Sequence, residues 1–288
     1  MKFERIIDGK DHLWAVRDMN KPKNELAALF QKWNDAEYLW DFFLENQDDL
    51  QEFFHIERLS EAVEDTIDDA EQLERLILEI PYTENLDELF LPLGSADMTI
   101  RELAREKARN WNRTGHASWL RVYAIRLEKN VFVVTGGAIK LTKAMQDRSH
   151  TQKELDKLNQ CRQFLASNGV FDSDSFYFND RGGQYMKSKA VQFLEAHQSG
   201  ERSTFVDDAK WRQENASWLK RSRRVAYAIM DYMQDSHLSR NDVAEKLGVS
   251  PQYVSKILSG KVNFSFKTIS EIEECLGIEV FQAAAMEA

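Results

Sequence analysis

The sequence has little proline and glycine: four prolines and twelve glycines among 288 residues. Both residues interrupt regular structure, so their scarcity favours a mostly helical protein. The chain also lacks an apolar run long enough to cross a bilayer. Its first residues, MKFERIIDGK, carry charges where a secretory signal needs an apolar stretch. We therefore expect a cytoplasmic protein that has no membrane partner.

Cysteine is equally scarce, and this excludes a disulfide framework. The only two cysteines, Cys161 and Cys275, lie far apart and form no paired spacing. This pattern fits a reducing compartment. The six histidines form no ligand cluster either. The sequence therefore predicts no metal site and no cofactor.

Charge is abundant but unevenly distributed. Residues 35–106 carry 22 acidic and 4 basic side chains, whereas residues 107–163 carry 12 basic and 4 acidic ones. Charge blocks of this kind are typical of surfaces that meet a partner of opposite sign. One hypothesis is that the acidic insert folds over the basic region or presents it to a partner. The alternative is an added helical subdomain with a solvated acidic face.

The stretch LSRNDVAEKLGVSPQYVSKILSGK, residues 238–261, contains start and stop signals for two short helices. Ser239 is an N-cap candidate, and Gly248 stands where a helix ends in a left-handed conformation. Ser250 then precedes Pro251, and proline is well tolerated at the first position of a helix. Apolar residues recur at spacings of three and four, which predicts one buried face on each helix. A further helix is expected after Ser265.

These residues resemble the helix-turn-helix domain of the lambda-repressor-like (Xre) family over about residues 217–280. The resemblance implies operator DNA as a partner, with the second helix of the motif in the major groove, and a homodimer on two half-sites. Gln252 would read a base edge, because its amide can pair bidentately with adenine. The other candidates would contact bases or phosphates, and they are Arg240, Ser250, Tyr253, Ser255, Lys256, Lys261 and Asn263. The alternative is a four-helix packing unit with a polar face.

The helix expected at 218–233 has four cations crowded at its start, which are Lys220, Arg221, Arg223 and Arg224. Cations at a helix N-terminus oppose the helix dipole, so another interaction must favour them. DNA phosphate is one candidate, and an acidic partner surface is another.

The N-terminal half predicts a small sheet with packed helices. Alternating apolar residues at 2–18 predict a strand, or a hairpin across Asp8 and Gly9. Residues 118–137 predict a second hairpin around Lys129 and Asn130. Helices are expected at 23–34 and from about Thr151 to Gly169, the latter with a capping box of Thr151 and Glu154.

The acidic insert predicts helices within 39–78. We expect Pro81 to end the last of these helices. A hydrophobic connection is expected at 86–94, and a helix capped by Thr99 at 99–111.

The motifs WLRVYAIRL, VFVVTGGAIKLTKAM and TQKELDKLNQCRQFL, within residues 116–166, resemble the RelE/HigB-like toxin family. The resemblance implies a compact antiparallel sheet with packed helices, encoded beside an antitoxin. Many members cut messenger RNA, commonly in the ribosome. The insert at 35–106 departs from this pattern, because it is far larger than a compact toxin requires.

Metal-independent RNA cleavage needs a group that takes the 2′-hydroxyl proton and cations that stabilise the phosphorane. Arg121 and Tyr123 are two residues apart on one strand, so they share a face opposite Leu120 and Val122. If Arg121, Tyr123, Lys140 and Lys143 converge on one cleft, either open or covered by the antitoxin-like part, the enzyme interpretation gains, and if they scatter, the regulator interpretation gains. Gly136 and Gly137, close to the two lysines in sequence, allow close backbone approach. The catalytic candidates are Arg121 and Lys140 for phosphate charge, Tyr123, His116 and His150 for proton transfer, and Lys143 for RNA binding. Solvated cations, a packed Tyr123 and a turn-capping His116 are the alternatives.

The predicted fold class is α+β: a small antiparallel sheet with a helical insert, followed by an all-α domain. We expect a toxin-like domain at 1–171, a linker at 172–186 and an antitoxin-like domain at 187–288. Together the resemblances imply a fused toxin–antitoxin protein, in which a metal-independent ribonuclease acting on mRNA or the ribosome is neutralised by a DNA-binding repressor. A helix-turn-helix regulator with a non-catalytic sensor or partner-binding domain is the main alternative. A gyrase-poisoning toxin of the related ParE type is a third.

Overall fold

The computed structural model describes residues 1–8, 12–83, 86–92, 100–103, 118–142, 148–170 and 188–281. The chain forms two compact units, each made of two segments. The sheet unit comprises Met1–Gln31 and Asp69–Ala209, and the helical unit comprises Lys32–Asp68 and Lys210–Ala288. The predicted α+β class is confirmed.

The sheet unit is built on six strands in the order β1-β2-β6-β5-β4-β3. Their bounds are β1 Lys2–Ile7, β2 His12–Arg17, β3 Phe90–Pro92, β4 Ile100–Leu103, β5 Leu120–Glu128 and β6 Val131–Ile139. Neighbouring strands pair antiparallel except β2 and β6, which run parallel. The sheet is therefore mixed, and the prediction of a wholly antiparallel sheet was wrong at this pair. A long connection between the two strands makes parallel pairing possible.

Both predicted hairpins are present. β1 pairs with β2 across residues 8–11, and β5 pairs with β6 around Lys129 and Asn130. Asn130 has a positive φ of 60°, which asparagine tolerates better than most residues. The alternating residues at 2–18 and the two apolar runs at 118–137 therefore identified these four strands.

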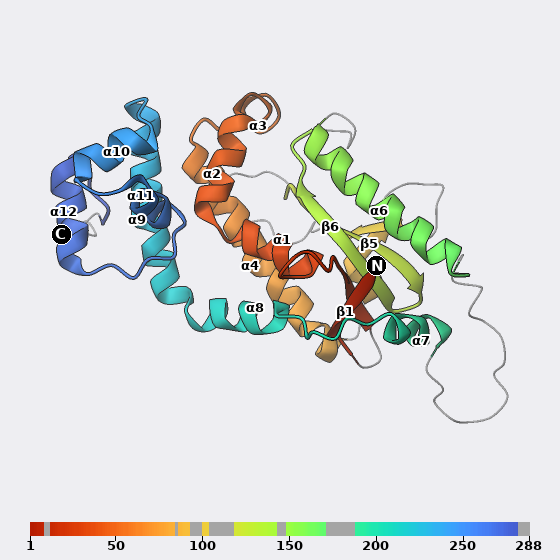
Figure 1. Cartoon of the computed structure of the whole chain (residues 1–288). Coiled ribbons are helices and arrows are strands. Elements are labelled where there is room, and N and C mark those ends of the chain that lie inside the picture. The colour runs from red at the N-terminus through yellow and green to blue at the C-terminus, as the bar shows by residue number, and fades with distance from the viewer. Residues whose placement is uncertain are drawn as a thin grey trace, which may run out of the picture. The chain divides into compact units, whose positions relative to one another are not determined.

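Helices lie on the sheet (Figure 1). α6 (Ser149–Ser167) and α7 (Lys189–Ala196) bury side chains in one cluster with β1, β2, β5 and β6. α1 (Glu25–Trp33) approaches β6, because a Cβ on Gly137 would lie 2.5 Å from the Leu29 side chain. α6 starts two residues before Thr151, whose hydroxyl donates to the Arg148 carbonyl. The predicted capping box was wrong, since Glu154 instead accepts a hydrogen bond from the Gly137 backbone N–H.

The acidic insert forms helices α2 Ala36–Glu45, α3 Gln47–Phe54, α4 Leu59–Thr83 and α5 Leu86–Leu89. Two predictions fail beyond them. α4 continues two residues past Pro81, and residues 90–92 and 100–103 form β3 and β4 rather than a connection and a helix. β4 pairs with β5 from Ile100 opposite Ile125, so a distant strand edge overrides the local helix signal. The remainder of the predicted helix at 99–111 lies outside the described residues.

The helical unit contains the four helices expected of the C-terminal half. They are α9 Ala216–Asp235, α10 Arg240–Leu247, α11 Pro251–Leu258 and α12 Phe266–Leu276. The helix before them in the sequence, α8 Phe205–Glu214, belongs to the sheet unit up to Ala209 and to the helical unit from Lys210. Figure 1 shows these helices in blue and cyan.

The boundaries of the two units differ from the predicted domain boundaries. Residues 188–209 belong to the sheet unit, because α7 buries Ala190, Val191 and Leu194 in its core and Phe3 bridges to Gln198. Residues 32–68 belong to the helical unit. Of the linker predicted at 172–186, no residue is described. Among the described helices, none is long and apolar enough to cross a membrane.

Candidate functional site

The two short helices of the C-terminal motif begin and end as the sequence predicts. The Ser239 side chain accepts a hydrogen bond from the Asp242 backbone N–H, and the Asp242 carboxylate accepts one from the Ser239 backbone N–H, which completes a capping box. α10 ends at Gly248, whose φ is 66°. The Ser250 hydroxyl caps α11 by accepting from the Tyr253 N–H at 3.2 Å. These caps fix the turn between α10 and α11.

The apolar faces of these helices close a core. The buried side chains are Val225, Ala226, Ile229, Met230, Met233, Val243, Ala244, Val254, Ile257, Leu258, Ile272 and Leu276. The predicted buried face on each of α10 and α11 is therefore confirmed, although Leu247, which is also apolar, is only half-buried. Such packing holds α10 and α11 rigidly together and leaves one face of α11 outside.

That outer face carries the predicted base-reading residues. Gln252 and Lys256 are exposed, and Tyr253 and Ser255 are half-buried between them. Ser250, also exposed, uses its hydroxyl as the N-cap. Asn263 lies exposed in the segment that follows α11. An amide and an ammonium on one helix face can hydrogen-bond to base edges in a major groove.

The two predicted phosphate cations flank the α10–α11 motif and form ion pairs with residues of α2 and its N-cap. Arg240, at the first position of α10, has its Nε 3.1 Å from Glu37 Oε1 and forms a second ion pair with Asp41. Lys261 follows α11, and its Nζ lies 2.8 Å from Asp35 Oδ2. These three acidic partners were not singled out from the sequence. The only signal for them was the high density of acidic residues at 35–106.

The cations of α9 are placed differently from expectation. The helix begins at Ala216, so Lys220 and Arg221 lie beyond its first turn. Arg223 is buried, only 7% exposed, and its guanidinium reaches Asn34 Oδ1 at 3.5 Å. Lys220, Arg221 and Arg224 are exposed. Arg223 is therefore a packing residue of the helical unit.

Residues 229–281 match the Helix-turn-helix family. The match covers the last seven residues of α9 and all of α10, α11 and α12. It supports a DNA-binding domain of the transcription-regulator class at this end of the chain. No curated protein and no solved structure matches the chain.

Of the predicted catalytic residues, three lie near one end of the β5–β6 hairpin. The Arg121 Nη1 donates to the carbonyls of Ser118 and Leu120, both at 2.8 Å. The Lys140 backbone N–H donates to the Trp119 carbonyl at 2.8 Å, and the His150 ring lies 3.0 Å from the Ile139 carbonyl. His116 and Lys143 lie outside the described residues.

Tyr123 does not join this group at the surface. Tyr123 is fully buried in the core cluster with Trp14 and Ile125, beneath α6 and α7. Arg121 pairs with Ala138, another member of that cluster, so the predicted sharing of one face holds. Helices rather than solvent cover this face, which matches the packed-aromatic alternative for Tyr123.

Gly136 and Gly137 lie within β6 and serve packing rather than a loop. A Cβ on Gly136 would lie 1.9 Å from Glu154 Oε2, and one on Gly137 would lie 2.5 Å from the Arg121 carbonyl oxygen. The two glycines thus let α6 and β5 approach β6 closely.

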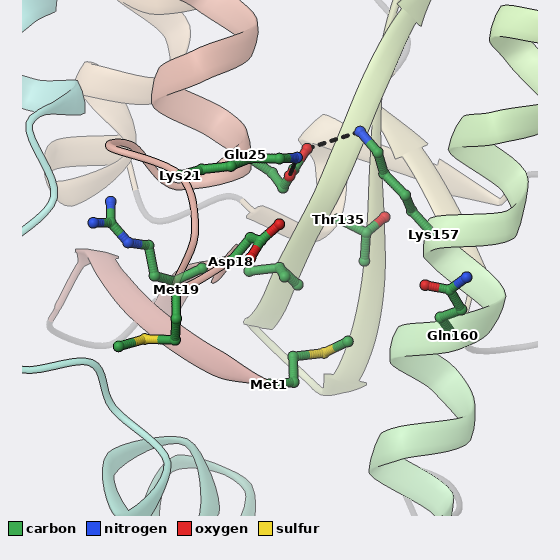
Figure 2. Close-up of a pocket in the computed structure, with 10 residues that line it drawn as sticks. Met1, Asp18, Met19, Lys21, Glu25, Thr135, Lys157 and Gln160 are labelled. Atoms are coloured by element: carbon green, nitrogen blue, oxygen red, sulfur yellow. Dashed lines mark hydrogen bonds and ion pairs between the residues drawn. The ribbon is translucent and has the colours of Figure 1, made fainter.

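Beside these glycines, the sheet unit has a pocket of about 380 Å³ between β2, α1, β6 and α6. Figure 2 shows Lys157 reaching from α6 toward Glu25 at the start of α1. Glu25 accepts from Lys157 at 2.9 Å and from Lys21 at 2.7 Å. Burial alone would raise the pKa of Glu25, but these two ammonium groups outweigh it and lower the pKa. Because both cations are neutralised, the pocket offers no free charge from these two lysines to an anionic ligand.

Proposed function

We propose that the protein is a transcription regulator that binds operator DNA through α10, α11 and the segment that follows α11. The observation that carries this proposal is the outer face of α11, where Gln252 and Lys256 project from a helix that is capped and packed on its other side. A rigid helix that presents polar groups suits insertion into the major groove. In this function the sheet unit serves as a sensor or partner-binding part.

Gln252 has the role of reading sequence, whereas Lys256, Lys261 and Arg240 supply affinity. An amide can pair bidentately with adenine, so its loss relaxes base choice at one position. Phosphate contacts have no sequence preference and make binding depend on salt. A homodimer would place two such helices on two half-sites, as helix-turn-helix domains commonly do.

Selection from a pool of random 30-base-pair duplexes tests this function. The full chain is expected to enrich a motif, and Gln252→Ala is expected to lose preference at one adenine of each half-site, a change of about 1–3 kcal/mol. Gln213→Ala, which removes an exposed amide from α8, is the matched control and should leave the motif unchanged. Failure of the wild type and of every variant to enrich any sequence would contradict the proposal.

A toxin–antitoxin fusion is the second candidate, and one observation favours it. α7 comes after the predicted linker, yet it buries Ala190, Val191 and Leu194 in the core of the sheet unit. An antitoxin arm that neutralises a toxin would need such a contact. The grouping of Arg121, Lys140 and His150 at one hairpin end is compatible with a phosphate site, whereas the burial of Tyr123 argues against its role in proton transfer.

Growth separates the two candidates. In the toxin reading, expression of residues 1–178 alone arrests growth, and residues 186–288 supplied separately relieve the arrest. Arg121→Ala with Lys140→Ala should abolish the arrest if the cations act on RNA, and should leave it intact if the target is gyrase. A soluble, folded fragment that leaves growth untouched would remove this candidate.

A further inference from the structure

The helix-turn-helix cations already have anionic partners within their own unit. Arg240 pairs with Glu37 and Asp41, and Lys261 pairs with Asp35. The three carboxylates come from one segment of seven residues, whereas the two cations lie at opposite ends of the α10–α11 motif. Residues 35–41 therefore contact both of the cations that, in the proposed function, contact DNA phosphates.

This segment is held in place by its backbone as well as by charge. The Asp35 side chain caps α2 by accepting from the Tyr38 N–H at 3.2 Å. The Ala36 N–H donates to the Ser259 carbonyl, at the end of α11, at 3.3 Å. The start of α2 therefore contacts the end of α11 directly.

Beyond these polar contacts, α2 buries the side chains of Ala36, Leu39, Trp40 and Phe43. An open pocket of about 490 Å³ lies beside it, between α2, the start of α3 and the α9–α10 turn, and its lining includes Trp40, Leu44, Met233 and His237. Leu44 and His237 are exposed, so α2 borders solvent on this side.

The charge balance of the unit agrees with these ion pairs. Residues 32–68 carry twelve acidic and two basic side chains, whereas residues 210–281 carry eleven basic and nine acidic ones. The acidic side chains that contact the motif therefore come from a segment with the strong negative charge that DNA also carries.

We infer that residues 35–41 mimic a DNA backbone, and that α2 competes with operator DNA for Arg240 and Lys261. Binding of DNA then requires α2 to move away from Arg240 and Lys261. The DNA affinity of the full chain is therefore lower than that of a motif whose two cations are free. This inference rests on the proposed DNA-binding function.

The first test compares three full-length chains. The neutralised chain carries Asp35→Asn, Glu37→Gln and Asp41→Asn, and asparagine preserves the N-cap of α2. The control chain carries Glu45→Gln, Asp48→Asn and Glu52→Gln. These three carboxylates are exposed on α2 and α3, and they form no ion pair with any described residue of the motif. Both chains gain the same net charge, so a general electrostatic effect appears equally in both.

Fluorescence anisotropy with a mixed-sequence 30-base-pair duplex, and with duplexes enriched from the random pool, measures the outcome. A partly exposed ion pair changes an equilibrium roughly twofold to threefold, so removal of three predicts about tenfold tighter binding by the neutralised chain. The control chain is expected to change binding less than about twofold. Salt weakens the internal ion pairs of the wild type as well as its DNA contacts, so the neutralised chain should show the steeper salt dependence.

The second test asks whether DNA binding releases Arg240 from the carboxylates of α2. Arg240→Ala should weaken binding more in a Glu37→Gln background than in the wild type, because in the wild type α2 already occupies the guanidinium. Equal losses in the two backgrounds would overturn the inference even if the triple variant folds poorly. Equal affinities of the wild-type, neutralised and control chains would overturn it while leaving the proposed function intact. Absence of DNA binding by all three chains would overturn both.

Discussion

Gly260 is the residue at which a single methyl group should most disturb the helix-turn-helix unit. It follows α11 with a φ of 72°, a conformation that side chains other than glycine adopt at a cost. A Cβ at this position would lie 2.8 Å from Arg223 Cγ and 3.6 Å from Ala36 Cβ. Arg223 is buried at its base as well as at its guanidinium, so it cannot move aside freely.

Gly277 provides a matched control for Gly260→Ala. Its φ is 66°, and no heavy atom lies within 4 Å of a Cβ built on it. Gly277→Ala should therefore cost only the backbone strain, about 1–2 kcal/mol. Gly260→Ala should cost this strain plus about 1–3 kcal/mol of overpacking. The difference between the two variants measures the contact between Gly260 and Arg223.

Native-state hydrogen exchange with mass spectrometry measures this difference. The amides of α11 and α12 report the opening free energy of the helical unit without requiring the whole chain to unfold in one step. We expect Gly260→Ala to lower that free energy by about 2–5 kcal/mol, and Gly277→Ala by about 1–2 kcal/mol. Equal losses in the two variants would show that the packing of Arg223 against Gly260 contributes nothing.

Three further predictions follow from the sheet unit and the cysteines. Leu194→Ala should destabilise the sheet unit by about 2–5 kcal/mol in urea unfolding, because Leu194 is fully buried, whereas the exposed Lys189→Ala should not. The pKa of Glu25 is lowered below 4.5, so the ionised carboxylate stabilises the folded chain above that pH, and this stabilisation is lost as the pH falls below it. Glu25→Gln should therefore flatten the acid limb of a plot of unfolding free energy against pH. Burial raises the pKa of Cys161 to about 12, whereas Cys275 is exposed, so only Cys275 should react with a thiol reagent at pH 8 in the folded chain. Mass spectrometry should then find one adduct on the folded chain and two on the chain in denaturant.

The sequence predicted the helical unit well where the signals were local. Ser239, Gly248, Ser250 and Ser265 act on backbone groups within a few residues, so their caps could be recognised without the fold. The β1–β2 and β5–β6 hairpins are also local, since each joins strands that follow each other along the chain.

The features that the sequence did not predict depend on distant partners. β4 forms because Ile100 and its neighbours reach the edge of β5, although their local pattern favours a helix. Tyr123 alternates with Val122 as expected, but α7, from much later in the chain, covers its face. The pairing of Arg240 with Glu37 joins residues about two hundred positions apart, and the charge blocks alone could not indicate which cations the acidic segment meets.

The DNA affinity of the full chain, measured as a function of salt, tests whether α11 contacts DNA. We compare wild type with Lys256→Ala on the outer face of α11, and with Lys210→Ala, which removes the same charge from an exposed position on α8. We expect Lys256→Ala to weaken binding and to lower the salt slope by about one, whereas Lys210→Ala should leave both nearly unchanged. Equal effects of the two substitutions, or no DNA binding by any of the three chains, would show that α11 is not the DNA-binding helix.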